Sequence, residues 1–250
     1  SHAMRTLAHR PVDVPAWRLK RGEDERPIHN HASQPQPNHM NLGGTVKLNS
    51  AGQIVAIDFR KEKISDARLK QLKHLNHLER LYIYGPYVTD LGLESLSGLT
   101  NLKQLWLTQT SITDEGMKTL AEFQQLESLV LAHCDGVTDA GLAHVKGLTH
   151  LKDLWLNGTR VSDEGLRQLS QLKHLETLAL PGTTAITDAG LQHLHGLPNL
   201  QDLWCRGANI SNQGLRLLAR LATLQFFDAS GTPLREPVPH FFRTPLPATG

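Results

Sequence analysis

Three tryptophans, Trp106, Trp155 and Trp204, lie 49 positions apart, each directly after a leucine. An indole offers a flat apolar face and one N–H donor, so it contributes to binding rather than to bond-making chemistry. Tryptophan, tyrosine and arginine are also the residue types that most often carry the binding energy of protein interfaces. The three tryptophans therefore indicate a binding surface.

Polar and aromatic residues lie beside the three tryptophans in the sequence. Arg206 adds a guanidinium that can bind a carboxylate through two parallel hydrogen bonds. Two interpretations remain open: the aromatic residues bind a partner, or they only shield the strands that carry them. The candidate partner-binding residues are Tyr82, Tyr84, Trp106, Asp153, Trp155, Asn157, Asp202, Trp204 and Arg206.

Catalytic and metal-binding patterns are missing from the sequence. It has no G-x-S-x-G, no phosphate-binding P-loop, no C-x-x-C and no H-E-x-x-H motif. His29, His31 and His39 suggest a metal site, but no fourth ligand follows at a regular spacing. We therefore expect no metal, no cofactor and no enzymatic activity.

The composition excludes several classes of partner. The 26 basic and 24 acidic residues of the 250 give a net charge of +2, so we expect no nucleic-acid binding. No apolar run approaches the roughly 20 residues of a membrane span, so we expect no membrane insertion. Cys134 and Cys205 lie about three repeats, or about 14 Å, apart, too far for a disulfide. Reduced thiols leave a cytoplasmic and an exported location equally open.

The elements that position these residues come from a repeat. The pattern L-x-x-L-x-L, a short turn and then I/V-S/T-D-x-G-L-x-x-L predicts one short strand and one helix per repeat. A period in the twenties predicts a solenoid, of class α/β, in which each repeat packs on its neighbours. Alternate repeats carry Trp, so the larger unit is a pair of repeats. The repeats begin at Ile54, Leu78, Leu102, Leu126, Leu151, Leu175, Leu200 and Leu224.

Each helix is predicted to begin at a Ser or Thr followed by Asp, as in Thr113-Asp114-Glu115-Gly116. The hydroxyl residue is the expected N-cap, and Asp complements the dipole of its own helix, a contribution of about 0.3–1 kcal/mol. We expect Gly116 and its equivalents to permit close packing of one repeat on the next. Arg68 replaces this Gly in the first repeat, and Asn212 replaces the Asp in the last helix-containing repeat.

Strand residues between the inward-pointing leucines are predicted to form an exposed row, Asp58, Tyr82, Trp106, Val130, Trp155, Ala179, Trp204 and Asp228. Indoles on alternate strands should lie about 10 Å apart, with shallow wells over Val130 and Ala179. A further exposed row holds Arg60, Tyr84, Asn157 and Arg206. Lateral charge pairing that stabilises the sheet is expected in the row Glu79, Lys103, Glu127, Lys152 and Glu176.

Three segments are predicted. Residues 1–41 hold a tag-like Ser1-His2-Ala3-Met4 start and a Pro-rich, polar leader that we expect to be poorly ordered. Residues 42–234 hold the solenoid, with a β-hairpin cap at about 45–57. Residues 235–250 form a Pro-rich tail that we expect to cap the C-terminal end.

The repeats, over residues 44–234, resemble those of leucine-rich-repeat (LRR) proteins. The S/T-D-x-G-L helix entry is similar to the ribonuclease-inhibitor-like and cysteine-containing classes, and the period of 24 resembles bacterial tandem LRR proteins of internalin-like or effector-like type. The resemblance implies a curved solenoid with a parallel sheet on its concave face, a partner bound there, and no catalysis.

Three functions are compatible with this sequence. The first is a monomeric, non-catalytic module that binds a protein partner on the concave strand face. The second is a carbohydrate-binding module that stacks sugars on the tryptophans. The third is an LRR segment of a larger effector-like or receptor-like protein.

Overall fold

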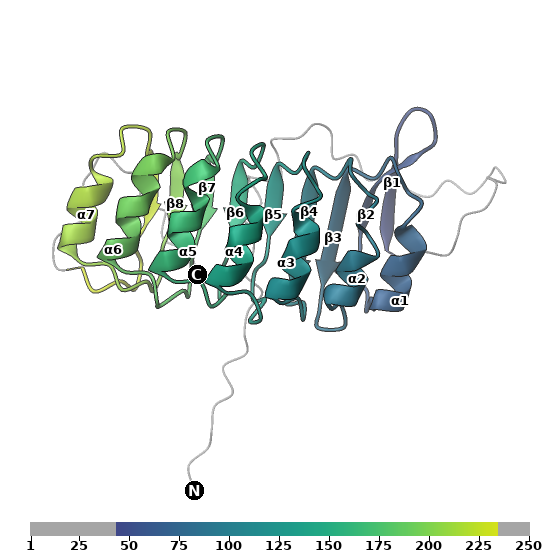
Figure 1. Ribbon diagram of the computed structural model, residues 1–250, viewed down its shortest axis with the longest axis horizontal. Coiled ribbons are helices and arrows are strands. Elements are labelled where there is room, and N and C mark those ends of the chain that lie inside the picture. Colours follow the sequence, from purple (N-terminus) through teal and green to yellow (C-terminus); the bar gives the residue numbers. More distant parts are fainter. Residues whose placement is uncertain (1–43, 235–250) are drawn as a thin grey trace, which may run out of the picture. The chain divides into compact units, whose positions relative to one another are not determined.

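The computed structural model describes residues 44–234, which form alternating strands and helices (Figure 1). The leader and the C-terminal tail lie outside the described residues. The strands are β1 (Thr45–Leu48), β2 (Ile54–Asp58), β3 (Arg80–Tyr84), β4 (Gln104–Thr108), β5 (Ser128–Val130), β6 (Asp153–Trp155), β7 (Thr177–Ala179), β8 (Asp202–Trp204) and β9 (Phe226–Asp228). The α-helices are α1 (Asp66–Leu69), α2 (Asp90–Glu94), α3 (Asp114–Leu120), α4 (Asp139–Val145), α5 (Asp163–Gln168), α6 (Asp188–Leu191) and α7 (Asn212–Leu218), and short 3₁₀ helices span Lys70–Leu72, Leu169–Gln171 and Gln192–Gly196.

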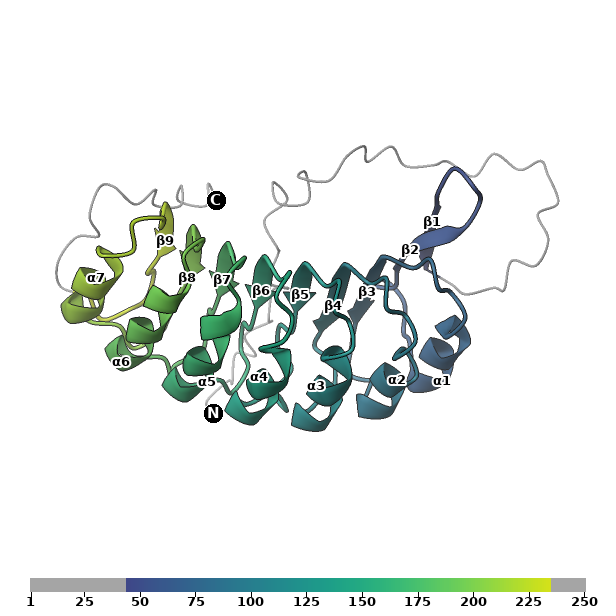
Figure 2. The same cartoon turned by 45° about the horizontal axis from the view of Figure 1, so that its top comes forward.

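The described strands form one nine-stranded sheet in sequence order, β1 to β9. All neighbours from β2 onward are parallel, and equivalent repeat positions lie opposite one another, as in Leu81↔Leu105 and Leu129↔Leu154. Figure 2 shows the strands along the inner side of a curved array and the helices along its outer side. The predicted α/β solenoid, with its sheet on the concave face, is therefore confirmed.

β1 and β2 form an antiparallel hairpin at the N-terminal end of the described sheet, where the alternating sequence predicts one. The side chain of Asn49 holds its turn, because Oδ1 accepts hydrogen bonds from the backbone N–H groups of Ala51 and Gln53, both at 3.0 Å. Gly52 adopts the left-handed conformation, with φ 75°. Thr45↔Asp58 is the first pair of the hairpin.

The core lies between the sheet and the helices and consists mainly of leucines. The inward strand residues Leu105, Leu129 and Leu154 are fully buried. So are Leu166 in α5 and Leu169 in the 3₁₀ helix that follows it, both on the face that the helical spacing predicts to point inward. One continuous cluster of buried apolar residues extends from Ile57 to Phe227, so each repeat depends on its neighbours for burial.

Small hydrogen-bonding side chains satisfy backbone carbonyls at the bends after several of the strands, as predicted for these repeats. The hydroxyl of Thr159 donates to the carbonyl of Leu156 at 2.8 Å, and that of Thr110 donates to the carbonyl of Leu107 at 3.3 Å. In the intervening repeat Cys134 takes this position, and its Sγ lies 2.8 Å from the carbonyl oxygen of Leu107. The bend is therefore linked to the preceding repeat as well as to its own strand.

The Asp at each helix start joins one repeat to the next. The carboxylate of Asp163 accepts a 2.8 Å hydrogen bond from the backbone N–H of Thr187 and a 2.6 Å hydrogen bond from its hydroxyl. We name the set of such bridges the carboxylate ladder. The expectation that Asp acts only on the dipole of its own helix was incomplete. The ladder pairs are Asp66–Thr89, Asp90–Thr113, Asp114–Thr138, Asp139–Ser162, Asp163–Thr187 and Asp188–Ser211.

The glycine in each helix entry makes room for this ladder. A Cβ atom built on Gly190 would lie 2.2 Å from Oδ1 of Asp163, and one on Gly92 would lie 2.2 Å from Oδ1 of Asp66. The prediction that glycine allows close packing between repeats is confirmed, and the atom that requires it is the carboxylate oxygen of the preceding repeat.

The two departures from the pattern lie at the ends of the ladder. Arg68 occupies the glycine position in α1, and the described residues contain no earlier helix whose carboxylate would need that space. Asn212 occupies the aspartate position in α7, which is the last described helix. Within the described residues, the first helix therefore needs no glycine and the last helix needs no aspartate.

Replacement of Asp163 by Ala should cost about 2–4 kcal/mol of unfolding free energy, because two hydrogen bonds to a charged acceptor are lost. Gly190→Ala should also destabilise, because its new methyl group would meet the carboxylate. In the Asp163→Ala background the same methyl group finds more room. Chemical denaturation of both single variants and the double variant should therefore give a double-variant loss smaller than the sum.

Gly147→Ala is the matched control, because a Cβ atom built there meets nothing within 4 Å. It should leave the unfolding free energy almost unchanged. Additive effects of Asp163→Ala and Gly190→Ala would show that the carboxylate and the glycine are not coupled.

Both described cysteines are buried free thiols, as predicted. Burial raises the pKa of Cys134 from 9.0 to about 11, although a hydrogen bond with Thr110 opposes the shift. Burial also raises the pKa of Cys205, and the nearby charge of Asp228 raises it further. Both thiols therefore stay protonated, and poor nucleophiles, near neutral pH.

Iodoacetamide at pH 8 should modify neither thiol of the folded protein and both thiols after denaturation, as measured by mass spectrometry. Stability should also depend on alkaline pH. The folded pKa of Cys134 lies above the unfolded value, so its contribution is complete below pH 9 and is lost as the pH rises towards 11. Cys134→Thr, the residue type of neighbouring repeats, should remove that part of the loss. Rapid alkylation of the native protein would contradict the burial of both thiols.

Candidate binding face

The concave face of the sheet carries three parallel rows of side chains. The strand register places the predicted middle row in one line, from Tyr82↔Trp106 through Val130↔Trp155 to Ala179↔Trp204. A second row lies on one side of it: Arg80, Gln104, Ser128, Asp153, Thr177, Asp202 and Phe226. A third row lies on the other side: Arg60, Tyr84, Thr108, Ala132, Asn157, Pro181 and Arg206.

The middle row is much less exposed than the sequence predicts. Trp106 exposes 8% of its surface and Trp155 only 4%, and Trp204 is half-buried. The shallow wells predicted over Val130 and Ala179 are also wrong, because these residues are 1% and 0% exposed.

The aromatic rings lean along the sheet instead of standing apart. The ring centroids of Trp155 and Trp204 lie 6.3 Å apart, although their strands are separated by two strand spacings, or roughly 10 Å. The small side chain of Ala179, between them in register, leaves room for this approach. Trp204 also packs on Phe226, with centroids 4.4 Å apart. The indoles therefore form a packed layer over the sheet.

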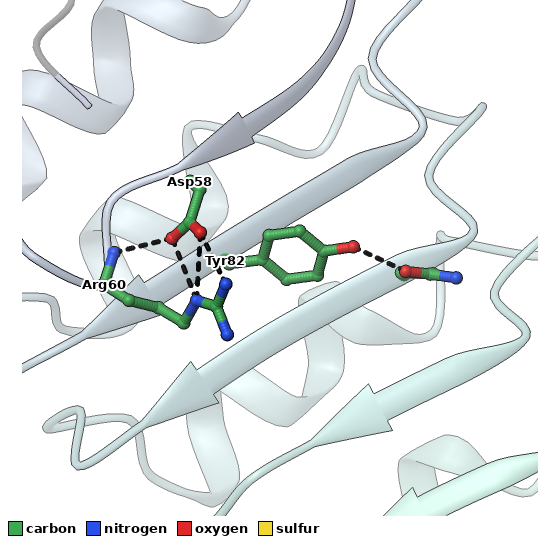
Figure 3. Close-up of polar contacts among 4 residues, drawn as sticks. Asp58, Arg60 and Tyr82 are labelled. Carbon is green, nitrogen blue, oxygen red and sulfur yellow. Dashed lines mark hydrogen bonds and ion pairs between the residues drawn. The ribbon is translucent and has the colours of Figure 1, made fainter. Parts of the chain in front are cut away.

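At the N-terminal end of the face, an arginine covers two aromatic rings. Cζ of Arg60 lies 5.3 Å from the ring centroid of Tyr82 and 5.4 Å from that of Trp106, within the range of a cation–π interaction. The Tyr82 hydroxyl donates a 2.6 Å hydrogen bond to the side-chain oxygen of Gln104 (Figure 3). Tyr82 and Trp106 themselves meet edge to face, with centroids 4.7 Å apart.

Asp58 holds this arginine in place. Its carboxylate forms a 2.6 Å ion pair with Arg60 and accepts a hydrogen bond from the Arg60 backbone N–H (Figure 3). Burial alone would raise the pKa of Asp58, but the hydrogen bonds and charge of Arg60 outweigh it, so the pKa lies below its ordinary value. The sequence placed both residues on the exposed rows but gave no sign that they form a pair.

The remaining candidate residues differ in their accessibility. Asp153 and Asp202 are half-buried in the second row, on either side of Thr177, and Tyr84 is half-buried in the third. Arg206 is exposed. Asn157, predicted to be exposed, is only 1% exposed. The period of two in a strand identifies the face on which Asn157 lies but not how deeply its neighbours cover it.

Polar atoms without a hydrogen-bond partner are concentrated on this face. In the described part of the chain, six buried side-chain atoms lack a partner, and all belong to the three concave rows. A buried unsatisfied polar group costs about 1–3 kcal/mol, so such atoms are uncommon. The six are Nε of Arg80, Nε1 of Trp106, Nδ2 and Oδ1 of Asn157, Oγ1 of Thr177 and Nε1 of Trp204.

Exposed charges at the start of the strands pair laterally, as expected. Lys103 lies 3.1 Å from Glu79, and Lys152 lies 2.7 Å from Glu127. The hydrogen bond with Glu127 raises the pKa of Lys152, although slight burial opposes this. Exposed pairs of this kind contribute little, and they agree with a role in sheet pairing.

Two other kinds of site have no counterpart in residues 44–234. No group of three or more His, Cys, Asp or Glu residues there is arranged to hold a metal ion. None of the helices in this range is long and apolar enough to cross a lipid bilayer.

Comparisons with solved structures show the same architecture in other proteins. Internalin C2 of Listeria monocytogenes is 22% identical, with a TM-score of 0.62 over 73% of this chain and 74% of that chain. Internalin F of the same organism is 18% identical, with a TM-score of 0.57 over 76% and 60%. The plant peptide hormone receptor RGFR1, in complex with RGF2, is 16% identical, with a TM-score of 0.50 over 78% and 34%.

Sequence comparisons identify the repeats themselves. No curated protein matches the chain by sequence. A family model described as Leucine Rich repeat matches residues 98–121, 124–143 and 147–170, which fall within the solenoid. The family model identifies these segments as leucine-rich repeats, and the solved structures share the solenoid fold of this chain.

Proposed function

We propose that this protein is a non-catalytic interaction module whose concave face binds a polypeptide partner. The observation that carries the proposal is the group of six buried, unpartnered polar atoms on that face. They include N–H donors of Trp106 and Trp204 and the complete amide of Asn157. A bound polypeptide has the carbonyl and N–H groups that would satisfy both kinds.

The distribution of these atoms matches an extended chain. Trp106 on β4 and Trp204 on β8 are four strand steps apart, or roughly 19 Å at about 4.8 Å per step. About six residues of extended polypeptide span that distance. Asn157 lies between them, and its amide can donate to and accept from one peptide unit at the same time. The fold is compatible with this use, since the structurally similar plant receptor RGFR1 was solved in complex with RGF2.

A carbohydrate ligand is less well supported. Sugar binding needs open indole faces, but Trp155 is 4% exposed and Trp106 is 8% exposed. The unpartnered N–H groups of Trp106 and Trp204 point instead to recognition by hydrogen bonding. The third function from the sequence, an LRR segment within a larger protein, is compatible with the same binding face.

Asn157→Leu is the sharpest test, because it separates binding from folding. Removal of a buried unpaired amide should leave the melting temperature unchanged or raise it, since an unsatisfied group disappears. Binding of a peptide selected on the native protein from a random phage-displayed library should weaken by about tenfold or more, because the partner's own groups lose their hydrogen bonds. Calorimetric titration and thermal melts measure the two effects.

Thr177→Val is a second test variant, because valine has nearly the same shape as threonine and no hydroxyl. Lys118→Ala is the control, because Lys118 lies on helix α3, away from the sheet. Thr177→Val should also weaken peptide binding, whereas Lys118→Ala should not. The proposal is wrong if no peptide is selected while a glycan array gives binding, or if Asn157→Leu binds selected peptides normally.

A further inference from the structure

Two residues adopt a backbone conformation that the other repeats assign to glycine. In the second position after the last inward strand residue, Gly158, Gly182, Gly207 and Gly231 have φ between 63° and 77°. Gln109 and His133 occupy the same position in two neighbouring repeats, both with φ 57°. They are the only non-glycine residues with positive φ among residues 44–234.

The repeat itself explains the backbone conformation but not the two side chains. The N–H of Gln109 donates to the carbonyl of Ala132 at 2.8 Å, and the N–H of His133 donates to that of Asn157 at 2.7 Å. Gly158 and Gly182 make the same bond with the next repeat. Glycine therefore suffices for the bond, whereas a side chain in the left-handed region adds strain. Strain of this kind is concentrated at functional sites.

Both side chains line one pocket of about 370 Å³ beyond the carboxyl ends of β4 and β5. Asp135 lines it as well, and Pro86 and Ser111 contribute from the preceding repeats. In the described part of the chain, the side chains of Gln109, His133 and Asp135 form no hydrogen bond or ion pair.

The lining is rich in acceptors and carries negative charge. Asp135 supplies an exposed carboxylate, and neither Lys nor Arg lines the pocket. A second carboxylate, that of Asp90, lies behind the wall, bonded to the N–H and hydroxyl of Thr113. The Gln109 side-chain oxygen is a further acceptor, and the Pro86 carbonyl already accepts a 2.8 Å hydrogen bond from the Ser111 hydroxyl. Arg160, at the position of Asp135 in the next repeat, forms no ion pair with it among the described residues.

We propose that this pocket binds an arginine side chain presented by a polypeptide. A guanidinium has five N–H donors and no acceptor, which matches several acceptors around one carboxylate. Its flat, cationic plane can bond Asp135 through two parallel hydrogen bonds and stack on the His133 imidazole. This proposal rests on the proposed concave-face function only in one respect, that the polypeptide carrying the arginine is the one bound there. Gln109 and His133 directly follow Thr108 and Ala132 of the third row, so the pocket adjoins the concave face.

A small probe tests the pocket without the concave-face partner. N-acetyl-L-arginine methylamide should cause saturable NMR shifts of the Gln109 side-chain amide and the His133 ring, with a Kd of roughly millimolar size. The citrulline analogue, which is neutral and of similar shape, should cause none. Asp135→Asn should weaken the arginine probe by about tenfold. Equal shifts with citrulline, no shifts with arginine, or full binding by Asp135→Asn would each overturn the proposal.

Substitutions at the strained positions give a second readout. Gln109→Gly and His133→Gly restore the residue of the other repeats, so each should raise the melting temperature and weaken the arginine probe. Gln109→Ala and His133→Ala keep a side chain at positive φ, so they should weaken the probe without that gain in stability. If the glycine variants bind the probe as well as the native protein, the two side chains do not form the site. Peptide binding by Asn157→Leu tests the concave face separately, so failure of one proposal can be told from failure of the other.

Discussion

The hydrogen bonds from each helix-start carboxylate to the next repeat are the interaction on which this structure depends. Leucine burial alone would hold a strand against a helix, but it is non-directional and tolerates sliding. The carboxylate ladder fixes the offset between repeats, because each Asp accepts both the N–H and the hydroxyl of one particular Ser or Thr. The parallel strand register on the opposite side then repeats without interruption.

This fixed register determines what the concave face can present. Equivalent residues of successive repeats lie side by side, so alternation between bulky and small residues in the sequence becomes alternation across strands. The large rings use the space over Ala179 and pack on one another instead of projecting. Aromatic packing therefore covers the sheet, and buried polar atoms within the three concave rows are left without a hydrogen-bond partner.

Much of the architecture could be predicted from the sequence because it follows from local spacing. The leucine pattern identified the strands, the inward face and the order of the sheet, and the Ser or Thr before each Asp identified the helix starts. The second partner of Asp163 could not be predicted in this way, because it is a contact between elements 24 residues apart. The burial of Asn157 and the leaning of Trp155 also depend on side-chain conformations in neighbouring repeats. The strained pair Gln109 and His133, in contrast, can be recognised once the repeats are aligned on their glycines.

The carboxylate ladder has a direction. The aspartate of each internal repeat bonds the Ser or Thr of the next repeat, and the glycine of each internal repeat leaves space for the aspartate of the preceding one. Internal repeats therefore present the same contacts on both sides and are interchangeable building blocks. Arg68 occupies the glycine position in α1, the first described helix, and Asn212 occupies the aspartate position in α7, the last described helix. A gene encoding such an array can gain or lose whole pairs of repeats by unequal recombination without new contacts having to evolve. The number of repeats, and with it the length of the concave surface, is then free to change in evolution while the two end repeats stay the same.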